Sequence, residues 1–105
     1  MMIDYVRREV PEEKQWQQLA EEATELAHAA LKVCRTLDDT NPTPVSFEEA
    51  MAKVHEELAD VRLAVMVLNL DNFSDNEVHG KIMINKLQRW TERLLNREGT
   101  ADGTT

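Results

Sequence analysis

The sequence has few of the residues that build turns and few aromatic side chains. Three glycines and three prolines are spread over 105 residues, and only 5% of the chain is aromatic. A sheet needs many turns, for which Gly and Pro are the usual residues, so their scarcity argues against a β-rich fold. The hydrophobic share of 42% still allows a core made mainly of aliphatic side chains. We therefore expect an all-α protein with long helices.

Features of secreted and membrane-spanning proteins are also missing. Cys34 is the only cysteine, so no intrachain disulfide can form, which favours a reducing compartment. The first ten residues, MMIDYVRREV, are too charged for a secretory signal. The longest apolar run, LAVMVL at 63–68, is far shorter than the roughly 20 residues that span a bilayer. We expect a cytoplasmic protein without a membrane partner.

Positive charge is scarce as well, since the formal net charge is -8. This charge argues against broad binding to a nucleic acid polymer or to an anionic membrane surface. It does not exclude a single nucleotide, because a bound divalent cation can reverse the local sign of the charge.

Three segments have the start and stop signals of long helices. Pro11 can occupy the first turn of a helix that runs to about Leu37. Capping-box pairs predict starts for the other two helices. They are Ser46 with Glu49, for a helix from near Phe47 to about Leu70, and Ser74 with Glu77, for a helix to about Arg97.

The expected fold is one all-α helical domain over residues 1–98, an antiparallel bundle of three long helices. Residues 1–10 can add a short helix, DDTNPTPV at 38–45 is expected to be a loop, and residues 99–105 a disordered tail.

The second helix has a coiled-coil-like apolar seam, because its apolar residues recur at alternating steps of four and three. They are Phe47, Met51, Val54, Leu58, Val61, Val65 and Leu68. From Val61 onward almost every side of this helix is apolar, which is typical of a helix buried on several sides. Three helices leave little to cover it, so we expect a homo-oligomer, a dimer or a tetramer, to complete the fold.

Two helices each have a pair of acids three residues apart, at the border of the expected buried face. The pairs are Glu22 with Glu25, and Glu57 with Asp60. Packed together, such helices bring several carboxylates to one place, where they repel one another. Hard cations such as Mg²⁺ or Mn²⁺ offset that cost through oxygen coordination. The pattern therefore predicts a metal site, although acid pairs in an acidic protein are commonly only solvated surface.

The third helix has a basic stripe, formed by Lys81, Asn85 and Arg89 at steps of four, with Lys86 nearby. This stripe lies opposite the apolar side of the helix. In a chain of net charge -8, the simplest reason for a basic face is phosphate.

Two rival interpretations stay open. Glu25 and His28 form a Glu-x-x-His pair, the element of di-iron helical bundles, which would make the chain an oxygen- or iron-handling protein. A non-enzymatic interaction protein, with the seam as its binding surface, is the third possibility. Trp16 can stack on a base, but packing at a helix border is the more common use of such a residue.

Two motifs resemble those of a known family, the MazG-like all-α nucleoside triphosphate pyrophosphohydrolases. EEATE at 21–25 is similar to the family's EExxE motif, and ELAD at 57–60 is similar to its ExxD motif. The surrounding segments also fit, and the resemblance covers about residues 12–94. The order of the motifs and their helical setting make the combination more specific than either motif alone.

The resemblance implies hydrolysis of (d)NTP to (d)NMP and pyrophosphate at a Mg²⁺ site. The implied site residues are Glu21, Glu22, Glu25, Glu57 and Asp60. Glu22 and Glu25 would be direct ligands, and Glu21 would position or deprotonate the attacking water. The implied substrate-binding residues are Lys81, Asn85, Lys86 and Arg89 for the phosphates, with Trp16 for the base.

Overall fold

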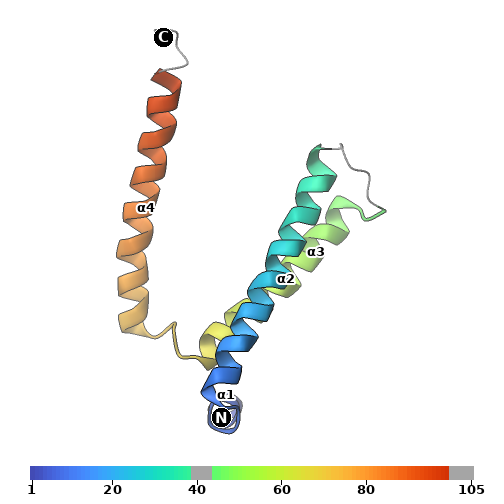
Figure 1. Cartoon of the computed structure of the whole chain (residues 1–105), viewed down its shortest axis with the longest axis vertical. Coiled ribbons are helices and arrows are strands. Elements are labelled where there is room, and N and C mark those ends of the chain that lie inside the picture. Colours follow the sequence, from blue (N-terminus) through green and yellow to red (C-terminus); the bar gives the residue numbers. More distant parts are fainter. Residues whose placement is uncertain (39–43, 100–105) are drawn as a thin grey trace. The chain divides into compact units, whose positions relative to one another are not determined.

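Helices dominate the structure, a computed structural model that describes residues 1–38 and 44–99. Four helices follow one another: α1 (Met2–Glu9), α2 (Glu12–Asp38), α3 (Phe47–Val67) and α4 (Phe73–Gly99) (Figure 1). No strand occurs in the described ranges. The predictions of an all-α fold and of a short N-terminal helix are confirmed. The predicted tail at 99–105 lies outside the described residues, apart from Gly99, which ends α4.

Among the described residues, no helix combines the length and the apolarity that crossing a membrane would require.

Pro11 separates α1 from α2. The residue before a proline is pushed toward extended backbone, and Val10 has φ -93° and ψ 124°. The carbonyl of Pro11 accepts hydrogen bonds from the backbone N–H groups of Lys14 and Gln15, at 2.9 and 3.1 Å, which starts the next helix. The chain therefore forms two helices here and not one continuous helix.

The N-termini of α3 and α4 are capped by side chains. Ser46 Oγ accepts a hydrogen bond from the Glu49 N–H at 3.1 Å, as the capping-box pattern predicts. The cap of α4 is Asn72, whose Oδ1 accepts from the Asp75 N–H at 2.9 Å. The predicted cap, Ser74, instead lies inside the first turn of α4. Asn caps a helix as well as Ser does, and the helix starts two residues before the position that the pattern predicted.

The C-terminus of α3 is a Schellman motif. The N–H of Asn69 donates to Met66 O at 3.0 Å, and the N–H of Leu70 donates to Val65 O at 3.1 Å. Asn69 has φ 58°, a left-handed conformation that Asn tolerates better than most residues. The helix therefore ends at Val67, three residues before the predicted end.

Residues Met1–Leu70 form one compact unit, and α4 belongs to a second unit that begins at Asp71. Within the first unit, α2 and α3 pack against each other as an antiparallel pair, and α1 packs against α3 (Figure 1). The structure thus shows the α2–α3 pair of the expected bundle and describes α4 by itself. The three-helix bundle stays a prediction.

Arg7 fastens α1 to the end of α3. Its Nε and Nη2 donate to Val67 O and Met66 O, each at 2.8 Å. These carbonyls lie in the last turn of α3, at the negative end of its dipole, where a cation is favourable. Gln15 fastens α1 to α2, because its Nε2 donates to Arg7 O and to Val10 O, both at 2.9 Å. All three helices of the unit are therefore held together at one end.

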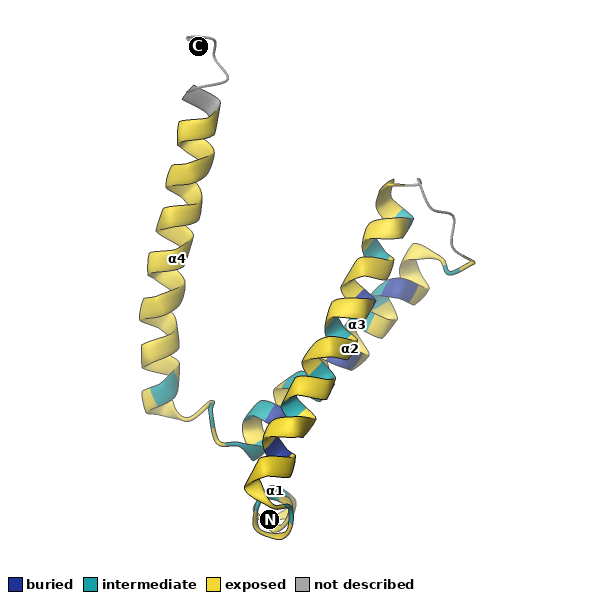
Figure 2. Cartoon of the chain, in the orientation of Figure 1, coloured by how far each residue is buried: buried dark blue, intermediate teal, exposed yellow. Residues whose placement is uncertain are grey.

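Five described residues are buried, and all lie on α2 or α3 (Figure 2). They are Gln15, Ala29, Ala50, Glu57 and Ala64. On α3 the buried residues are seven apart, which places them on one face. Each of these buried residues comes one position before a residue of the expected seam. Ala50, Glu57 and Ala64 are followed by Met51, Leu58 and Val65. The residues of that seam are half-buried or exposed in a single copy of the chain, so its role as a contact surface stays a prediction.

Large apolar side chains stay exposed in both units. In the first unit, Leu63 is 55% and Met66 43% exposed, and on α4 Met83 is 67% and Trp90 60% exposed. The buried hydrophobic residues among those described are three alanines. Among its described residues, a single copy of the first unit therefore has no fully buried large apolar side chain.

Candidate metal site

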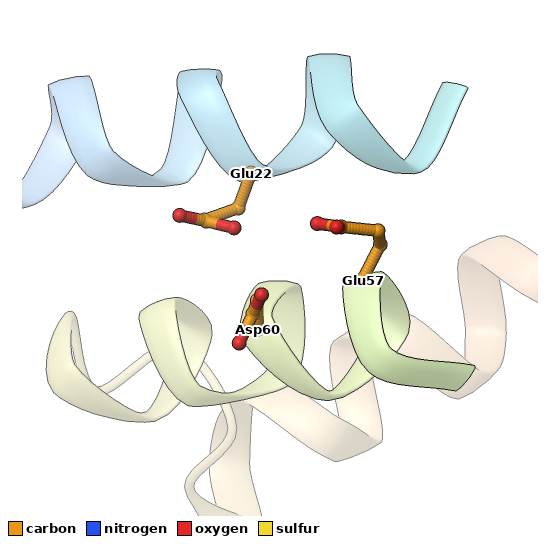
Figure 3. Close-up of side chains that lie close together, drawn as sticks. All are labelled: Glu22, Glu57 and Asp60. Carbon is orange, nitrogen blue, oxygen red and sulfur yellow. The ribbon is translucent and has the colours of Figure 1, made fainter. Parts of the chain in front are cut away.

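Three carboxylates meet between α2 and α3. Glu22 comes from α2, and Glu57 and Asp60 come from α3, one helical turn apart (Figure 3). One oxygen of each lies within 4.8 Å of the others. We call these residues the carboxylate triad. The antiparallel pairing of the helices brings together residues that are 35 or more positions apart in the sequence.

Glu22 and Glu57 of the triad lie in line with the buried residues of their helices. Glu57 lies seven residues from both Ala50 and Ala64, and Glu22 lies seven residues from Gln15 and Ala29. Because Glu22 meets Glu57 and the helices are antiparallel, Ala29 faces Ala50 two turns further along. We call the level of Glu22 and Glu57 the carboxylate layer, and the level of Ala29 and Ala50 the alanine layer.

Glu57 is the most buried member of the triad, at 5% exposed, whereas Glu22 and Asp60 are partly exposed. A buried carboxylate is costly unless it is paired. Lys53 supplies a partner, with Nζ 3.0 Å from Glu57 Oε1 and 3.6 Å from Glu56 Oε2. One half-exposed ammonium group thus shares its charge between a buried and an exposed carboxylate.

The surroundings of Glu22 disfavour the charged form of its carboxyl. Partial burial raises the pKa of its carboxyl, and the negative charges of Asp60 and Glu57 raise it further. A hydrogen bond from Gln18 Nε2 to Glu22 Oε1, 2.5 Å long, opposes the rise. The pKa of Lys53 is raised, first by its hydrogen bond to Glu57 and then by the charge of Glu56. The triad therefore favours binding a proton or another cation.

A pocket of about 460 Å³ opens beside the triad, within the first unit. Glu22 and Asp60 form part of its wall. Its apolar lining comes from α1, α3 and the residue before Pro11: Val6, Val10, Leu63, Ala64 and Val67. Its remaining lining comes from α2: Lys14, Gln15, Gln17, Gln18 and Glu21. The volume lies within the range of about 300–1,000 Å³ that is usual for small-molecule sites.

The other residues expected at the first-unit site lie around the triad. Glu21 is exposed and lines the pocket. Glu25 is exposed and is not part of the triad. Trp16 is 48% exposed and does not belong to the pocket lining. His28, the ligand of the di-iron alternative, is exposed and is not part of the triad either.

The expected phosphate-binding residues all lie on α4 and are exposed. Lys81 and Asn85 line one shallow hollow of that helix, and Lys86 and Arg89 line another together with Trp90. The basic stripe is thus divided between two hollows of a single helix.

Sequence reasoning missed Lys53 and Gln15. The signal for Lys53 was present, because it lies four residues before Glu57, a spacing that pairs charges on a helix. Gln15 gave no such signal, since its role depends on carbonyls at the end of α1.

Three carboxylates around one point are the ligand set that hard divalent cations prefer. Comparison of the chain with protein-family models, with curated proteins and with solved structures finds no match. The chemistry of the triad and its pocket is therefore the basis for a functional proposal.

Proposed function

We propose that this protein is a Mg²⁺-dependent nucleoside triphosphate pyrophosphohydrolase, which converts (d)NTP to (d)NMP and pyrophosphate. The observation that carries the proposal is the carboxylate triad, with its buried Glu57, at the edge of a ligand-sized pocket. The EExxE-like and ExxD-like motifs supply the members of this triad, as the resemblance to MazG-like enzymes implies.

The spacing of the triad suits a divalent cation. Oxygens bound to one Mg²⁺ lie up to about 4 Å apart, twice its bond length of about 2.1 Å. The three oxygens lie within 4.8 Å of one another, so small side-chain adjustments would bring them into range. Mn²⁺ fits the same oxygen ligands. Glu25, one turn beyond Glu22 on α2, is the candidate for a further ligand.

The reaction is an attack of water on the α-phosphorus. A bond forms between the water oxygen and that phosphorus, and the bond to the oxygen that bridges to the β-phosphorus breaks, so pyrophosphate leaves. Mg²⁺ would supply charge neutralisation of the phosphates and activation of the water. Glu21, which lines the pocket beside Glu22, would orient the water or take its proton. Lys81, Asn85, Lys86 and Arg89 would bind the remaining phosphate oxygens.

The exposed apolar side chains support a homo-oligomer as the active form. Leu63 and Met66 of α3, with Trp90 and Met83 of α4, are each more than 40% exposed, and burial of such area favours association. We expect a dimer or a tetramer. Light scattering at micromolar concentration measures the mass, and a monomer would contradict this part of the proposal.

The decisive experiment is a panel of ribo- and deoxyribonucleoside triphosphates with Mg²⁺, assayed for monophosphate and pyrophosphate. Pyrophosphate release that EDTA abolishes would support the proposal. Release of orthophosphate alone, or no turnover at all, would overturn it. Mg²⁺ without effect on the melting temperature would then favour an interaction protein, and colour on aerobic iron loading would favour the di-iron alternative.

A further inference from the structure

The side chain of Gln15 is fixed in one orientation. Its Nε2 lies 2.9 Å from both Arg7 O and Val10 O. Two carbonyl oxygens can only accept, so the group between them must be the NH₂ of the amide, and both of its hydrogens are used. The amide oxygen, Oε1, therefore points its lone pairs elsewhere.

This oxygen is left as an acceptor. Gln15 is only 7% exposed, and among the described residues no group donates a hydrogen bond to Oε1. No described buried side-chain atom is both inaccessible and without a partner, so Oε1 keeps accessible surface. Gln15 lines both the pocket beside the triad and a second hollow near Pro11, and the first of these is the one that reaches the carboxylates. An unpaired acceptor on a nine-tenths buried side chain that lines a pocket is a group that a ligand can satisfy.

The distance from the triad is that of a nucleoside. Gln15 and Glu22 are seven residues apart on α2, which is a rise of about 10.5 Å. A nucleoside covers such a span between its 5′-phosphate and the far edge of its base. Between these two ends lie apolar side chains, among them Val6, Leu63 and Val67, which suit the face of a base.

We propose that this pocket holds the nucleoside of the substrate, and that Gln15 Oε1 selects bases with an amino group at pyrimidine C4 or purine C6, cytosine or adenine, over bases with a carbonyl there, such as uracil or thymine. The inference rests on the proposed function, since it names the substrate class of the same site. An amino group at the edge of the base donates to Oε1. A carbonyl at that position offers a second acceptor, so two acceptors face each other and the Gln15 oxygen stays unpaired.

Two pairs of nucleotides test the selection without turnover. dCMP and dUMP differ in an amino group and a carbonyl at the same ring position, as do dAMP and dIMP. Calorimetric titration of the full chain in Mg²⁺ should give at least about tenfold tighter binding of the amino member in each pair, because a site built to pair with a polar group rejects the analogue that lacks it. Equal affinity, reversed order in either pair, or no binding of any of the four at millimolar concentration would overturn the inference.

A matched pair of variants assigns the selection to one side chain. Gln15→Met should reduce the dCMP-to-dUMP affinity ratio to about one, whereas Gln17→Met, the same change at an exposed residue of the same pocket, should leave it unchanged. A purely structural role of Gln15 would weaken both nucleotides alike and keep the ratio, which would contradict its role as the selecting group. If Gln15→Met does not fold, the wild-type pairs decide.

The inference and the proposed function can fail separately. Amino selection without pyrophosphate release from any triphosphate would leave a nucleotide-binding pocket but remove the enzyme. Pyrophosphate release without amino selection would leave the enzyme and remove the role of Gln15.

Discussion

The alanine layer and the carboxylate layer lie on the same face of the same two helices, two turns apart, and differ in chemistry. Ala29 and Ala50 are 3% and 2% exposed and have no polar side-chain atom to satisfy. Glu22 and Glu57 occupy the equivalent positions seven residues away, and Glu57 is buried to nearly the same degree. Small side chains allow the helices to approach closely, and at the second level this closeness forces carboxylates together.

This difference separates a structural position from a functional one. Apolar residues at the carboxylate layer would remove the cost of desolvating and crowding negative charge. A residue whose chemistry does not suit its structural position, such as a carboxylate on a buried face, is expected at a functional site. The alanine layer thus explains why the helices pack, whereas the carboxylate layer needs a ligand to explain its residues.

The largest expected effect is on activity. Glu57→Gln and Asp60→Asn should each lower Mg²⁺-dependent pyrophosphate release by more than about 100-fold. Mutation of a residue that only hydrogen-bonds to a metal ligand already lowers metal affinity or activity about 10–100-fold. Glu56→Gln is the matched control: the same change, one residue away, at an exposed acid outside the triad. Comparable loss in all three variants would assign the effect to general charge and not to the triad.

The second effect, on folding, should have opposite signs at the two layers. Ala50→Leu overpacks the alanine layer and should lower the free energy of unfolding by about 1–3 kcal/mol. Glu57→Leu should leave it unchanged or raise it, because it removes a buried charge while Lys53 can turn to solvent.

Urea denaturation in EDTA measures both changes, with Ala52→Leu, at an exposed position of α3, as the control. A large destabilisation by Glu57→Leu would mean that the ion pair with Lys53 holds the helices together. The carboxylate layer would then be structural.

Capping residues and prolines predict where helices begin and end. Such a boundary is predicted accurately when its signal depends only on neighbouring residues. Ser46 and Pro11 act on residues within one turn, so both helix starts are where the pattern places them. The end of α3 was missed because Asn69 in a left-handed conformation is one choice among several for that loop. The cap of α4 was missed likewise, because Asn72 serves as a cap as well as the predicted Ser74 would.

The site is predicted less completely, because it depends on contacts between helices. Spacing alone identifies the pairs Glu22 with Glu25 and Glu57 with Asp60. The side of α2 that packs against α3 decides which member of the first pair faces α3. The helices pack along buried alanines, and not along the larger apolar residues on which the expected seam was based. Glu22 therefore joins the triad while Glu25 lies outside it.

The third effect is a pH dependence at the carboxylate layer. The pKa of Glu22 is raised from its ordinary 4.5, so folding favours the protonated form. Well below pH 4.5 the group is protonated in both states and costs nothing. As the pH rises through that value and then through the higher folded pKa, the unfolded chain loses its proton first and the native state loses stability.

Glu22→Gln removes this loss. The metal-free variant should be more stable than wild type at pH 7, and the difference should shrink progressively as the pH falls through about 4.5, the ordinary value. Thermal melts across pH 4–8 in EDTA measure it, with Glu25→Gln as the exposed control on the same helix. An advantage that persists at low pH would show that the raised pKa is not its cause.

The smallest effect concerns Lys53, whose ammonium group pairs with one member of the carboxylate layer, Glu57. Its Nζ lies 3.0 Å from Glu57 Oε1, so a cation that binds this oxygen must displace the ammonium group or share the oxygen with it. Because Lys53 is half exposed, the competition is weak, and Lys53→Met should raise Mg²⁺ affinity only about two- to fivefold. The raised pKa of Lys53 keeps it charged throughout the neutral range, so the gain should not vary between pH 6 and 8.

Lys32→Met, at an exposed position of α2, changes the net charge equally and should leave the affinity almost unaltered. Calorimetric Mg²⁺ titrations of the two variants separate local competition from overall charge. Weaker binding by Lys53→Met would instead mean that Lys53 holds Glu57 in its binding orientation, and the carboxylate layer would then depend on its ammonium neighbour with the metal as well as without it.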